Sequence, residues 1–276
     1  MLLLRNHAAE SQPRGLPMIR SLKLATAALI GGMMLSTSAV QAQQTIESAG
    51  LTILTTPLIG SDYMFRGLSQ TRNRPTAQVT VDVEHTSGLY VGAFVSNVAF
   101  AGTNARQEVD VSGGYRFELA GVKLDLGATY YAYPGYDAPT GGYELNYYEF
   151  ILRASYEIAP VKFVGMAAYS PDFTGESGTG IYVEGGFDMA LDFGFTIGGR
   201  YGYQWVERNF ARPGRNEGAF GAEDYSNVSV FVSREIIGGV IGTLSGVFTS
   251  LDQRADCFGG SKVCDNRVVF TLSRPF

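Results

Sequence analysis

The chain has 276 residues, among them 35 glycines, 16 tyrosines and 17 phenylalanines. Its 21 basic and 26 acidic residues give a formal net charge of −5 at pH 7. This balance argues against a nucleic-acid partner, because nucleic acids are bound mainly through lysine and arginine side chains.

The first predicted element is a secretory signal over residues 18–42. Arg20 and Lys23 give it a positively charged start, residues 24–35 form an apolar run, and residues 40–42 fit a small-residue cleavage site. The apolar run is too short to cross a bilayer as a helix, and no stop-transfer pattern follows it. We therefore expect the protein to be exported.

Two start sites are compatible with this signal. Met18 would leave residues 1–17 upstream of the true start, whereas Met1 would give an unusually long signal. In both cases we predict that residues 1–42 are an N-terminal extension with a cleavable signal and that residues 43–276 form one domain. The mature chain keeps 17 basic and 25 acidic residues, a net charge of −8. It has no further long apolar stretch, which excludes transmembrane helices.

The mature chain is built from segments of about ten residues in which apolar and polar side chains alternate, as in the strands of outer-membrane barrels. Turn residues separate these segments. The pattern predicts twelve strands, over residues 54–68, 76–85, 89–98, 107–119, 122–133, 144–158, 161–170, 180–190, 193–205, 223–235, 240–250 and 267–276.

The connections between the segments alternate between short turns and longer loops. Outer-membrane barrels have short periplasmic turns and longer outer loops, and an even strand number places both termini in the periplasm. We therefore predict an all-β fold, a transmembrane antiparallel β-barrel of the outer-membrane type with about 12 strands.

The segment over residues 122–133 illustrates the two expected faces. Leu124 and Leu126 share one face, and Lys123 and Asp125 share the other. We expect the apolar face to contact lipid and the polar face to line a wet lumen. Aromatic residues toward the outer strand ends are expected to form an interfacial girdle: Tyr130, Tyr131, Tyr133, Tyr201, Tyr203 and Trp205.

Two-residue turns at residues 120–121 and 159–160 fix the register of the strands beside them. They place opposite charges directly across the ladder on the polar face, where each pair contributes about 0.2–1 kcal/mol. We therefore predict salt bridges across this part of the lumen, between Glu118 and Lys123, Arg116 and Asp125, and Glu157 and Lys162.

Cys257 and Cys264 are the only cysteines, and both lie in one glycine-containing segment of the exported chain. This placement predicts a disulfide that closes a small loop. A zinc site is disfavoured, because no histidine lies nearby and too few ligands are present.

The stretch SDYMFRGLSQT at residues 61–71 resembles the opening motif of the TorF family of porins, a bacterial outer-membrane family. The resemblance continues through YYAYPG at residues 130–135 and YSPDF at residues 169–173, and it covers most of the mature chain. It implies a pore, and it supplies no substrate. Pro57 and Pro275 depart from the family pattern, and each removes a ladder donor, so the seam between the first and last strands is expected to be irregular.

The final segment, residues 267–276, alternates apolar and polar residues and ends on Phe276. Resemblance to other outer-membrane proteins implies that such a terminal aromatic strand serves as a tag for the barrel-assembly machinery.

Asp62 and Arg66 are the charged residues of the opening motif. They lie four residues apart, so in a strand they would share one face, and we expect both to point into the lumen. Four residues span about 13 Å along a strand, so the two side chains cannot pair directly. A loop centred near residue 72 would bring Asp62 close to Asp82. The two carboxylates would then form either a cation-attracting spot or part of a structural network completed by an arginine from another strand.

Ten charged side chains are expected to line the pore: Asp62, Arg66, Asp82, Asp110, Arg116, Asp125, Glu149, Arg153, Glu184 and Arg200. Acidic residues outnumber basic ones across the predicted lumen. Because charged rings set the sign preference of pores, we predict a weak preference for cations.

These features predict a porin or channel for passive diffusion of small solutes or ions across the outer membrane of a Gram-negative bacterium. The alternative is a structural or surface-interaction barrel with a closed lumen, since twelve strands enclose less space than the roughly sixteen to eighteen of open porins. Expected partners are outer-membrane lipid, lipopolysaccharide, the barrel-assembly machinery and small solutes.

An outer-membrane lipid hydrolase is a weaker alternative. His85 is the one histidine of the mature chain, and Ser87 lies close to it. A hydrolase of this type also needs an acidic residue to orient the histidine, and none is evident in the sequence. We therefore expect no enzymatic activity, no catalytic residues, no metal site and no cofactor.

Overall fold

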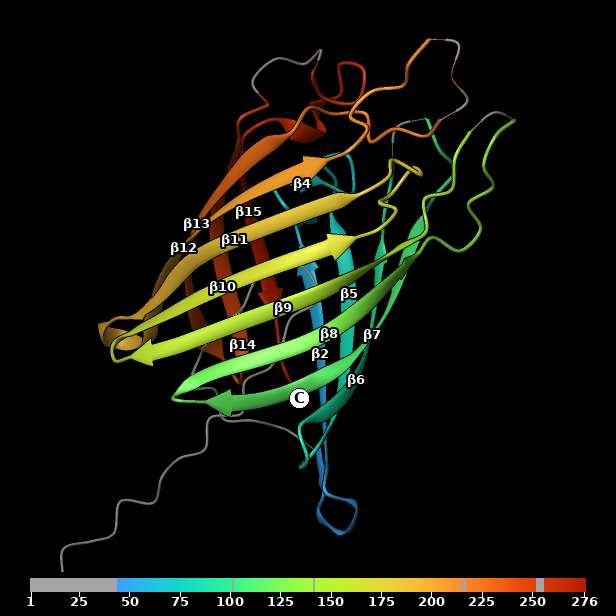
Figure 1. The fold of residues 1–276 in the computed structure, drawn as a ribbon. Helices are drawn as coiled ribbons and strands as arrows, with labels where there is room; N and C mark the ends of the chain where they lie inside the picture. Colours follow the sequence, from blue (N-terminus) through green and yellow to red (C-terminus); the bar gives the residue numbers. More distant parts are fainter. Residues whose placement is uncertain (1–43, 101, 141, 214, 216, 252–255) are drawn as a thin grey trace, which may run out of the picture.

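The computed structural model describes residues 44–276 except residues 101, 141, 214, 216 and 252–255, so the predicted signal lies outside the described residues. In the described part, thirteen strands form one antiparallel sheet. Twelve of them close a ring, because β2 pairs with β5 on one side and with β15 on the other (Figure 1). The remaining strand, β1, pairs with β2 alone. The chain therefore forms a closed antiparallel β-barrel, as predicted.

The ring strands in chain order are β2 (Leu51–Gly60), β5 (Thr76–His85), β6 (Leu89–Asn97), β7 (Gln107–Leu119), β8 (Val122–Ala132), β9 (Tyr147–Ile158), β10 (Val161–Ser170), β11 (Gly180–Ala190), β12 (Phe195–Val206), β13 (Tyr225–Ile237), β14 (Val240–Thr249) and β15 (Arg267–Ser273). Outside the ring are β1 (Gln44–Ile46), the small hairpin of β3 (Met64–Phe65) and β4 (Leu68–Ser69), and the 3-10 helices Glu47–Ala49, Asp192–Gly194 and Lys262–Cys264. None of the helices among the described residues is long and apolar enough to cross a membrane.

Most ring strands begin and end within a few residues of the predicted bounds. The exception is the first strand, predicted over residues 54–68, which ends at Gly60. Residues 61–75 instead leave the barrel wall and carry the β3–β4 hairpin. Below, we call the end of the barrel with the long connections the loop end and the opposite end the turn end.

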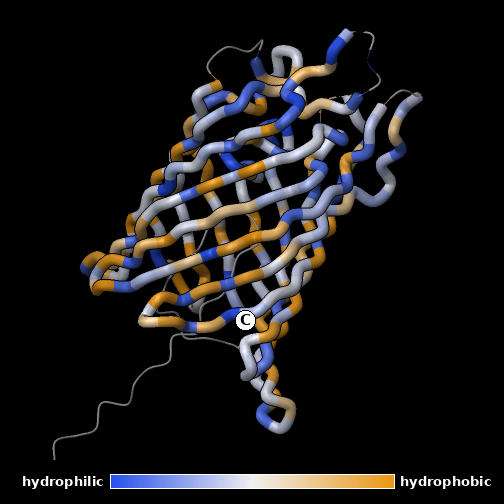
Figure 2. The backbone as a smooth tube through the Cα atoms, viewed as in Figure 1, coloured by the Kyte–Doolittle hydropathy of each residue, from blue (hydrophilic) through white to orange (hydrophobic). Residues whose placement is uncertain are grey.

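Hydrophobic and hydrophilic residues alternate along the strands of the barrel wall (Figure 2). The apolar side chains of Val91, Val111 and Phe150 are more than half exposed on the outer face. By contrast, Asp110 and Glu149 are each only 1% exposed, because they point into the barrel. An apolar outer wall around a polar interior is what a closed barrel needs in lipid.

Four of the six residues predicted for the aromatic girdle lie on the outer face of the barrel. Tyr130, Tyr201, Tyr203 and Trp205 are exposed on the outer face. The prediction was wrong for Tyr131 and Tyr133, which are buried inside the barrel. Tyr131 lies an even number of residues from Asp125 in β8, so both side chains point into the lumen.

The two-residue turns set the predicted register. Glu118 pairs with Lys123 and Arg116 with Asp125 across β7 and β8, and Lys162 pairs with Glu157 across β9 and β10. The Arg116 Nε lies 3.5 Å from Asp125 Oδ2. The other two pairs form no ion pair within the described residues, which corrects the prediction of three salt bridges. Glu118 and Glu157 are exposed near a barrel end, where water screens their charges and pairing adds little stability.

The seam between β2 and β15 closes despite its two prolines. Thr55 and Phe276 exchange two backbone hydrogen bonds, of 3.1 and 2.7 Å, and the carbonyl of Pro57 accepts one from the Arg274 N–H at 3.2 Å. Pro57 therefore removes one donor from the ladder and leaves its acceptor in use. Pro275 lies past the last residue of β15, where a missing donor interrupts no strand pairing. The C-terminal residue is thus part of the closure.

A tyrosine ring packs over two glycines inside the turn-end half of the barrel. Gly114 and Gly127 are paired across β7 and β8, and Tyr90 on β6 is paired with Gly114. A Cβ on Gly114 would lie 2.4 Å from the Leu126 carbonyl oxygen, and one on Gly127 would lie 2.5 Å from the Tyr90 hydroxyl. Glycine is needed at both positions, because the phenol ring occupies the space that a side chain would fill.

We predict that Gly114→Ala destabilises the barrel by about 1–3 kcal/mol, because the added methyl overpacks against the backbone of β8 and the Tyr90 ring. Urea unfolding of protein refolded into lipid vesicles measures this change. Gly185→Ala is the matched control, since a Cβ there meets no atom within 4 Å. Equal stability of the two variants would contradict the packing role assigned to Gly114.

Candidate functional site

The first long connection of the barrel folds inward as a hairpin. Met64 pairs with Ser69 and Phe65 with Leu68, so Arg66 and Gly67 form its tip. Both tip residues have positive φ angles, 48° and 84°, as the two central residues of a tight type I′ hairpin turn require. We call residues 61–75 the inward loop and Arg66–Gly67 its tip.

The tip contacts the inner wall of the barrel at β13 and β14. A Cβ on Gly67 would lie 2.8 Å from the Cβ of Asn227 on β13 and 2.8 Å from Cγ2 of Thr249 on β14. Glycine is therefore required here both by the left-handed backbone and by the closeness of the wall. The hairpin has no room for a larger side chain at this position.

Arg66 is fixed to two strands across the ring from β2. Its two terminal nitrogens donate to both carboxylate oxygens of Glu149 on β9, at 2.8 and 2.6 Å. One of them also donates to Oε1 of Gln204 on β12 at 2.9 Å. The Tyr131 hydroxyl donates to the same Glu149 carboxylate at 3.1 Å. A two-pronged guanidinium–carboxylate contact of this kind is strong and directional.

Two aromatic rings enclose the Arg66 guanidinium. Its central carbon lies 4.3 Å from the ring centroid of Tyr182 and 4.7 Å from that of Phe65. Arg66 and Glu149 are 8% and 1% exposed, so water provides little solvation to either charge. Loss of either partner leaves a buried unpaired charge, which costs about 3–5 kcal/mol.

The base of the inward loop is tied to the seam. Asp62 accepts hydrogen bonds from Ser69 Oγ at 2.7 Å and Thr71 Oγ1 at 2.6 Å, and it forms an ion pair with Arg267 of β15 at 2.9 Å. The backbone N–H of Ala99, in the next outer loop, donates to the carbonyl of Gln70 at 2.8 Å. Side chains and backbone therefore both hold this loop in place.

This arrangement resolves the two alternatives for Asp62. The expected approach of Asp62 to Asp82 is wrong, because β2 pairs Leu54 with Asp82 and Asp62 lies eight residues farther along the chain. An arginine from another strand, Arg267, completes the network instead. Sequence reasoning missed Arg267 because the β2–β15 seam brings together residues from opposite ends of the chain.

Aromatic side chains fill the loop end of the lumen around the hairpin. Tyr63 lies 5.8 Å from Phe94, and Tyr131 stacks on Tyr147 at 4.4 Å, both measured between ring centroids. The cluster includes Tyr63, Phe94, Val98, Ala105, Tyr131, Tyr133, Tyr147, Phe173 and Val206. The hairpin and these rings together occupy the loop end of the barrel interior.

A second charged group lies toward the turn end. Arg116 donates to Glu84 Oε2 at 2.6 Å and lies 3.5 Å from Asp125 and 3.9 Å from Asp82. Arg153 approaches the same Asp125 at 3.8 Å. The Arg116 guanidinium also lies 3.8 Å from the centroid of the Tyr90 ring, whose support by glycines is described above.

The other predicted pore-lining residues lie apart from these two groups. Arg200 donates to Asp188 at 2.5 Å, and Glu184 accepts from the Tyr182 hydroxyl at 2.8 Å. Asp110 is buried beside Glu108, and neither of its carboxylate oxygens has a hydrogen-bond partner within the described residues. The ten predicted residues thus fall into several clusters inside the barrel rather than one ring.

His85 and Ser87 form a local turn contact. His85 Nδ1 lies 2.8 Å from Ser87 Oγ and accepts from the Ser87 N–H at 3.1 Å, and both residues are exposed at the turn end. Within the described ranges, no three His, Cys, Asp or Glu residues are placed to hold a metal ion. Cys257 and Cys264 form the expected disulfide in the last long loop.

We predict that Arg66 and Glu149 are strongly coupled in stability. Arg66→Met and Glu149→Gln should each cost about 3 kcal/mol of unfolding free energy, and the double variant should cost clearly less than their sum. Urea unfolding in lipid vesicles gives the four free energies of this cycle. Glu157→Gln is the control, because Glu157 lies on the same strand but is exposed. Additive costs would show that the pair does not hold the hairpin.

The fold resembles solved outer-membrane porins. A NanC porin matches with a TM-score of 0.50 and 8% identity, over 80% of this chain and 97% of that chain. A KdgM porin matches with a TM-score of 0.49 and 9% identity, over 81% of this chain and 97% of that chain. OprD of Pseudomonas aeruginosa matches with a TM-score of 0.45 and 12% identity, over 89% of this chain and 72% of that chain. At these identities the likeness concerns the fold alone.

No curated protein matches the chain in sequence. A family described as "Bacterial protein of unknown function (Gcw_chp)" matches residues 46–276, which is nearly the whole predicted mature domain. This match does not carry the TorF name that the opening motif suggested. The chain belongs to the Gcw_chp family of bacterial proteins.

Proposed function

We propose that the protein is an outer-membrane channel for passive diffusion of small solutes or ions, and that the inward loop sets its conductance. The observation that carries this proposal is the Arg66–Glu149 contact, which holds a loop tip inside the barrel. A loop held across a lumen limits the size of what can pass.

The charged interior supports a channel over a solid barrel. A barrel with only a structural role could fill its interior with apolar side chains, which is often as stable as buried ion pairs or more so. This barrel instead carries charged groups at several levels between its two ends, from Arg66 and Glu149 to Arg116 and Glu84. Charged linings of this kind govern which solutes pass through a pore.

The sign of the ion preference remains a prediction from the sequence. Acidic residues outnumber basic ones among the side chains predicted to line the lumen. We therefore propose a weak preference for cations in the barrel itself.

A barrel with a closed lumen is the second candidate, and one observation favours it. Asp110, Glu149 and Asp188 are at most 2% exposed, so the interior around them is tightly filled. In this candidate the hairpin is a permanent plug rather than an adjustable constriction.

The remaining features of the proposal concern location and assembly. We propose that residues 18–42 direct export and that the barrel lies in the outer membrane of a Gram-negative bacterium, in contact with lipid and lipopolysaccharide. The strand ending at Phe276 is proposed as the contact for the barrel-assembly machinery. Membership of the TorF family of porins, suggested by residues 61–71, belongs to the same proposal.

Single-channel recording in planar bilayers tests the conductance role. We predict small discrete steps for the refolded protein and steps several-fold larger when residues 62–73 are replaced by a short Gly-Ser linker, because the constriction is removed. Glu149→Gln should raise the conductance or its fluctuations, since it frees the tip. Glu157→Gln makes the same charge change near the turn end and should leave the steps unchanged.

Two results would contradict the proposal. Absence of steps from both the intact protein and the linker variant would favour a closed barrel. Equal conductance of the intact protein and the linker variant would show that a channel exists but that the inward loop does not control it.

A further inference from the structure

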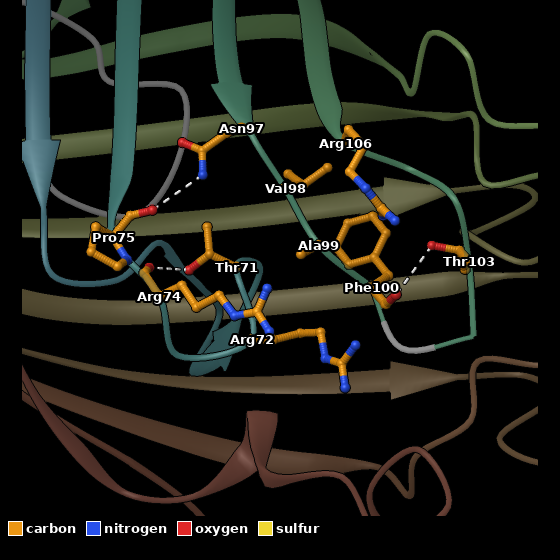
Figure 3. A pocket seen from close by; sticks show the side chains of 10 residues that line it. All are labelled: Thr71, Arg72, Arg74, Pro75, Asn97, Val98, Ala99, Phe100, Thr103 and Arg106. Carbon is orange, nitrogen blue, oxygen red and sulfur yellow. Dashed lines mark hydrogen bonds between the residues drawn. The ribbon is translucent and has the colours of Figure 1, made fainter.

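A cavity of about 360 Å³ lies at the loop end, between the inward loop and the connection from β6 to β7. Figure 3 shows the side chains that line it, which come from these two loops and the strand ends beside them. Its volume falls within the usual range of pockets for small molecules. Three arginines, Arg72, Arg74 and Arg106, lie among its lining residues.

The neutral polar residues of the cavity are already engaged in bracing its walls. Thr71 Oγ1 lies 2.6 Å from the Arg74 carbonyl oxygen, Thr103 donates to the Phe100 carbonyl at 3.3 Å, and Asn97 donates to the Pro75 carbonyl at 3.2 Å. These hydrogen bonds are drawn in Figure 3. The charged groups with donors left for a ligand are the three guanidinium groups.

The arginines keep most of their donors free. Arg106 uses one terminal nitrogen to donate to the Ala105 carbonyl at 2.7 Å, and each guanidinium carries five N–H donors. In the part of the chain that the structure describes, none of the three forms an ion pair with a carboxylate. These three arginines line one cavity although the chain has more acidic than basic residues.

The backbone that carries Arg72 is held in an uncommon conformation. Arg72 and Asn73 have φ angles of 55° and 65°, in the left-handed region that non-glycine residues rarely adopt. The Asn73 N–H donates to Ser69 Oγ at 2.8 Å, and its side chain accepts from Arg267. Strained backbone that the surrounding structure holds in place is concentrated at binding sites.

The remaining wall is apolar. Pro75, Val98, Ala99 and Phe100 line the cavity beside the arginines. A ligand that fits both surfaces has an anionic head for the guanidinium groups and an apolar or ring-shaped body for this wall. Guanidinium groups bind carboxylates and phosphates with two parallel hydrogen bonds, which favours such heads over halide ions.

We propose that this cavity is a binding site for small organic anions that carry a carboxylate or phosphate group. The site lies on the loop side of the hairpin, so it would collect such anions at the mouth of the barrel. Binding at the mouth does not require that the barrel conducts, and the proposal stands apart from the proposed channel role.

Isothermal titration of the refolded protein in detergent micelles tests the site with three probes: phenyl phosphate, inorganic phosphate and phenol. Phenyl phosphate should bind most tightly, inorganic phosphate more weakly, and phenol not measurably, because phenol lacks the anionic head. Arg72→Gln, Arg74→Gln and Arg106→Gln should each weaken phenyl phosphate binding roughly tenfold. The triple variant should not bind it.

The control is Arg212→Gln, which removes an exposed arginine from another outer loop and makes the same change in net charge. It should change the affinity by less than about twofold. The proposal is overturned if the intact protein does not bind phenyl phosphate at millimolar concentration, if the triple variant binds as well as the intact protein, or if Arg212→Gln weakens binding as much as the other changes.

Discussion

The ion pair between Arg66 and Glu149 joins the first long loop to the opposite wall of the barrel. A buried guanidinium is stable only with a matched carboxylate and further hydrogen bonds. Glu149 provides the carboxylate, Gln204 accepts from the guanidinium, and Tyr182 packs over it. Gly67 is required at the same tip, because the tip lies so close to Asn227 and Thr249 that no side chain fits there.

Closure of the ring is the second constraint, and it explains the form of the seam. Backbone donors and acceptors within lipid must be paired, and a closed barrel pairs them without leaving an edge. At the seam the pairing extends to Phe276, which exchanges backbone hydrogen bonds with Thr55. Arg267, on the seam strand, then holds the base of the inward loop through Asp62. Arg267 therefore lies on the strand that closes the barrel wall and also holds the loop that lies inside the barrel.

The strands could be predicted from the sequence because a period of two is a local property. The turn at residues 120–121 fixes the register of β7 and β8 and thus the pairing of Arg116 with Asp125. The sequence also predicts that the Glu149 side chain points into the lumen, because alternate residues of a strand share one face.

The inward loop could not be predicted in this way. Alternation continues from β2 through Arg66, so residues 54–68 have the pattern of one strand. The signal that could have located the hairpin is the Arg66–Gly67 step, because glycine there allows a tight turn with positive φ. The partners of the loop could not be read from local patterns, since Glu149 and Arg267 lie 83 and 205 residues from their contacts. The arginine cavity was missed for the same reason, as its two loops meet only in the folded barrel.

The most direct test asks whether the hairpin lies inside the barrel and is held there by Glu149. The two native cysteines form a disulfide, so Leu68→Cys introduces the one free thiol at a hairpin position that is 5% exposed. The rate at which a maleimide added from outside modifies this thiol, in protein refolded into vesicles, reports the burial of the hairpin. We expect slow modification, faster modification with Glu149→Gln, and no change with Glu157→Gln. Rapid modification of the Leu68→Cys protein that keeps Glu149 would contradict a hairpin held in the lumen by this ion pair. Equal modification rates in all three proteins would contradict it as well.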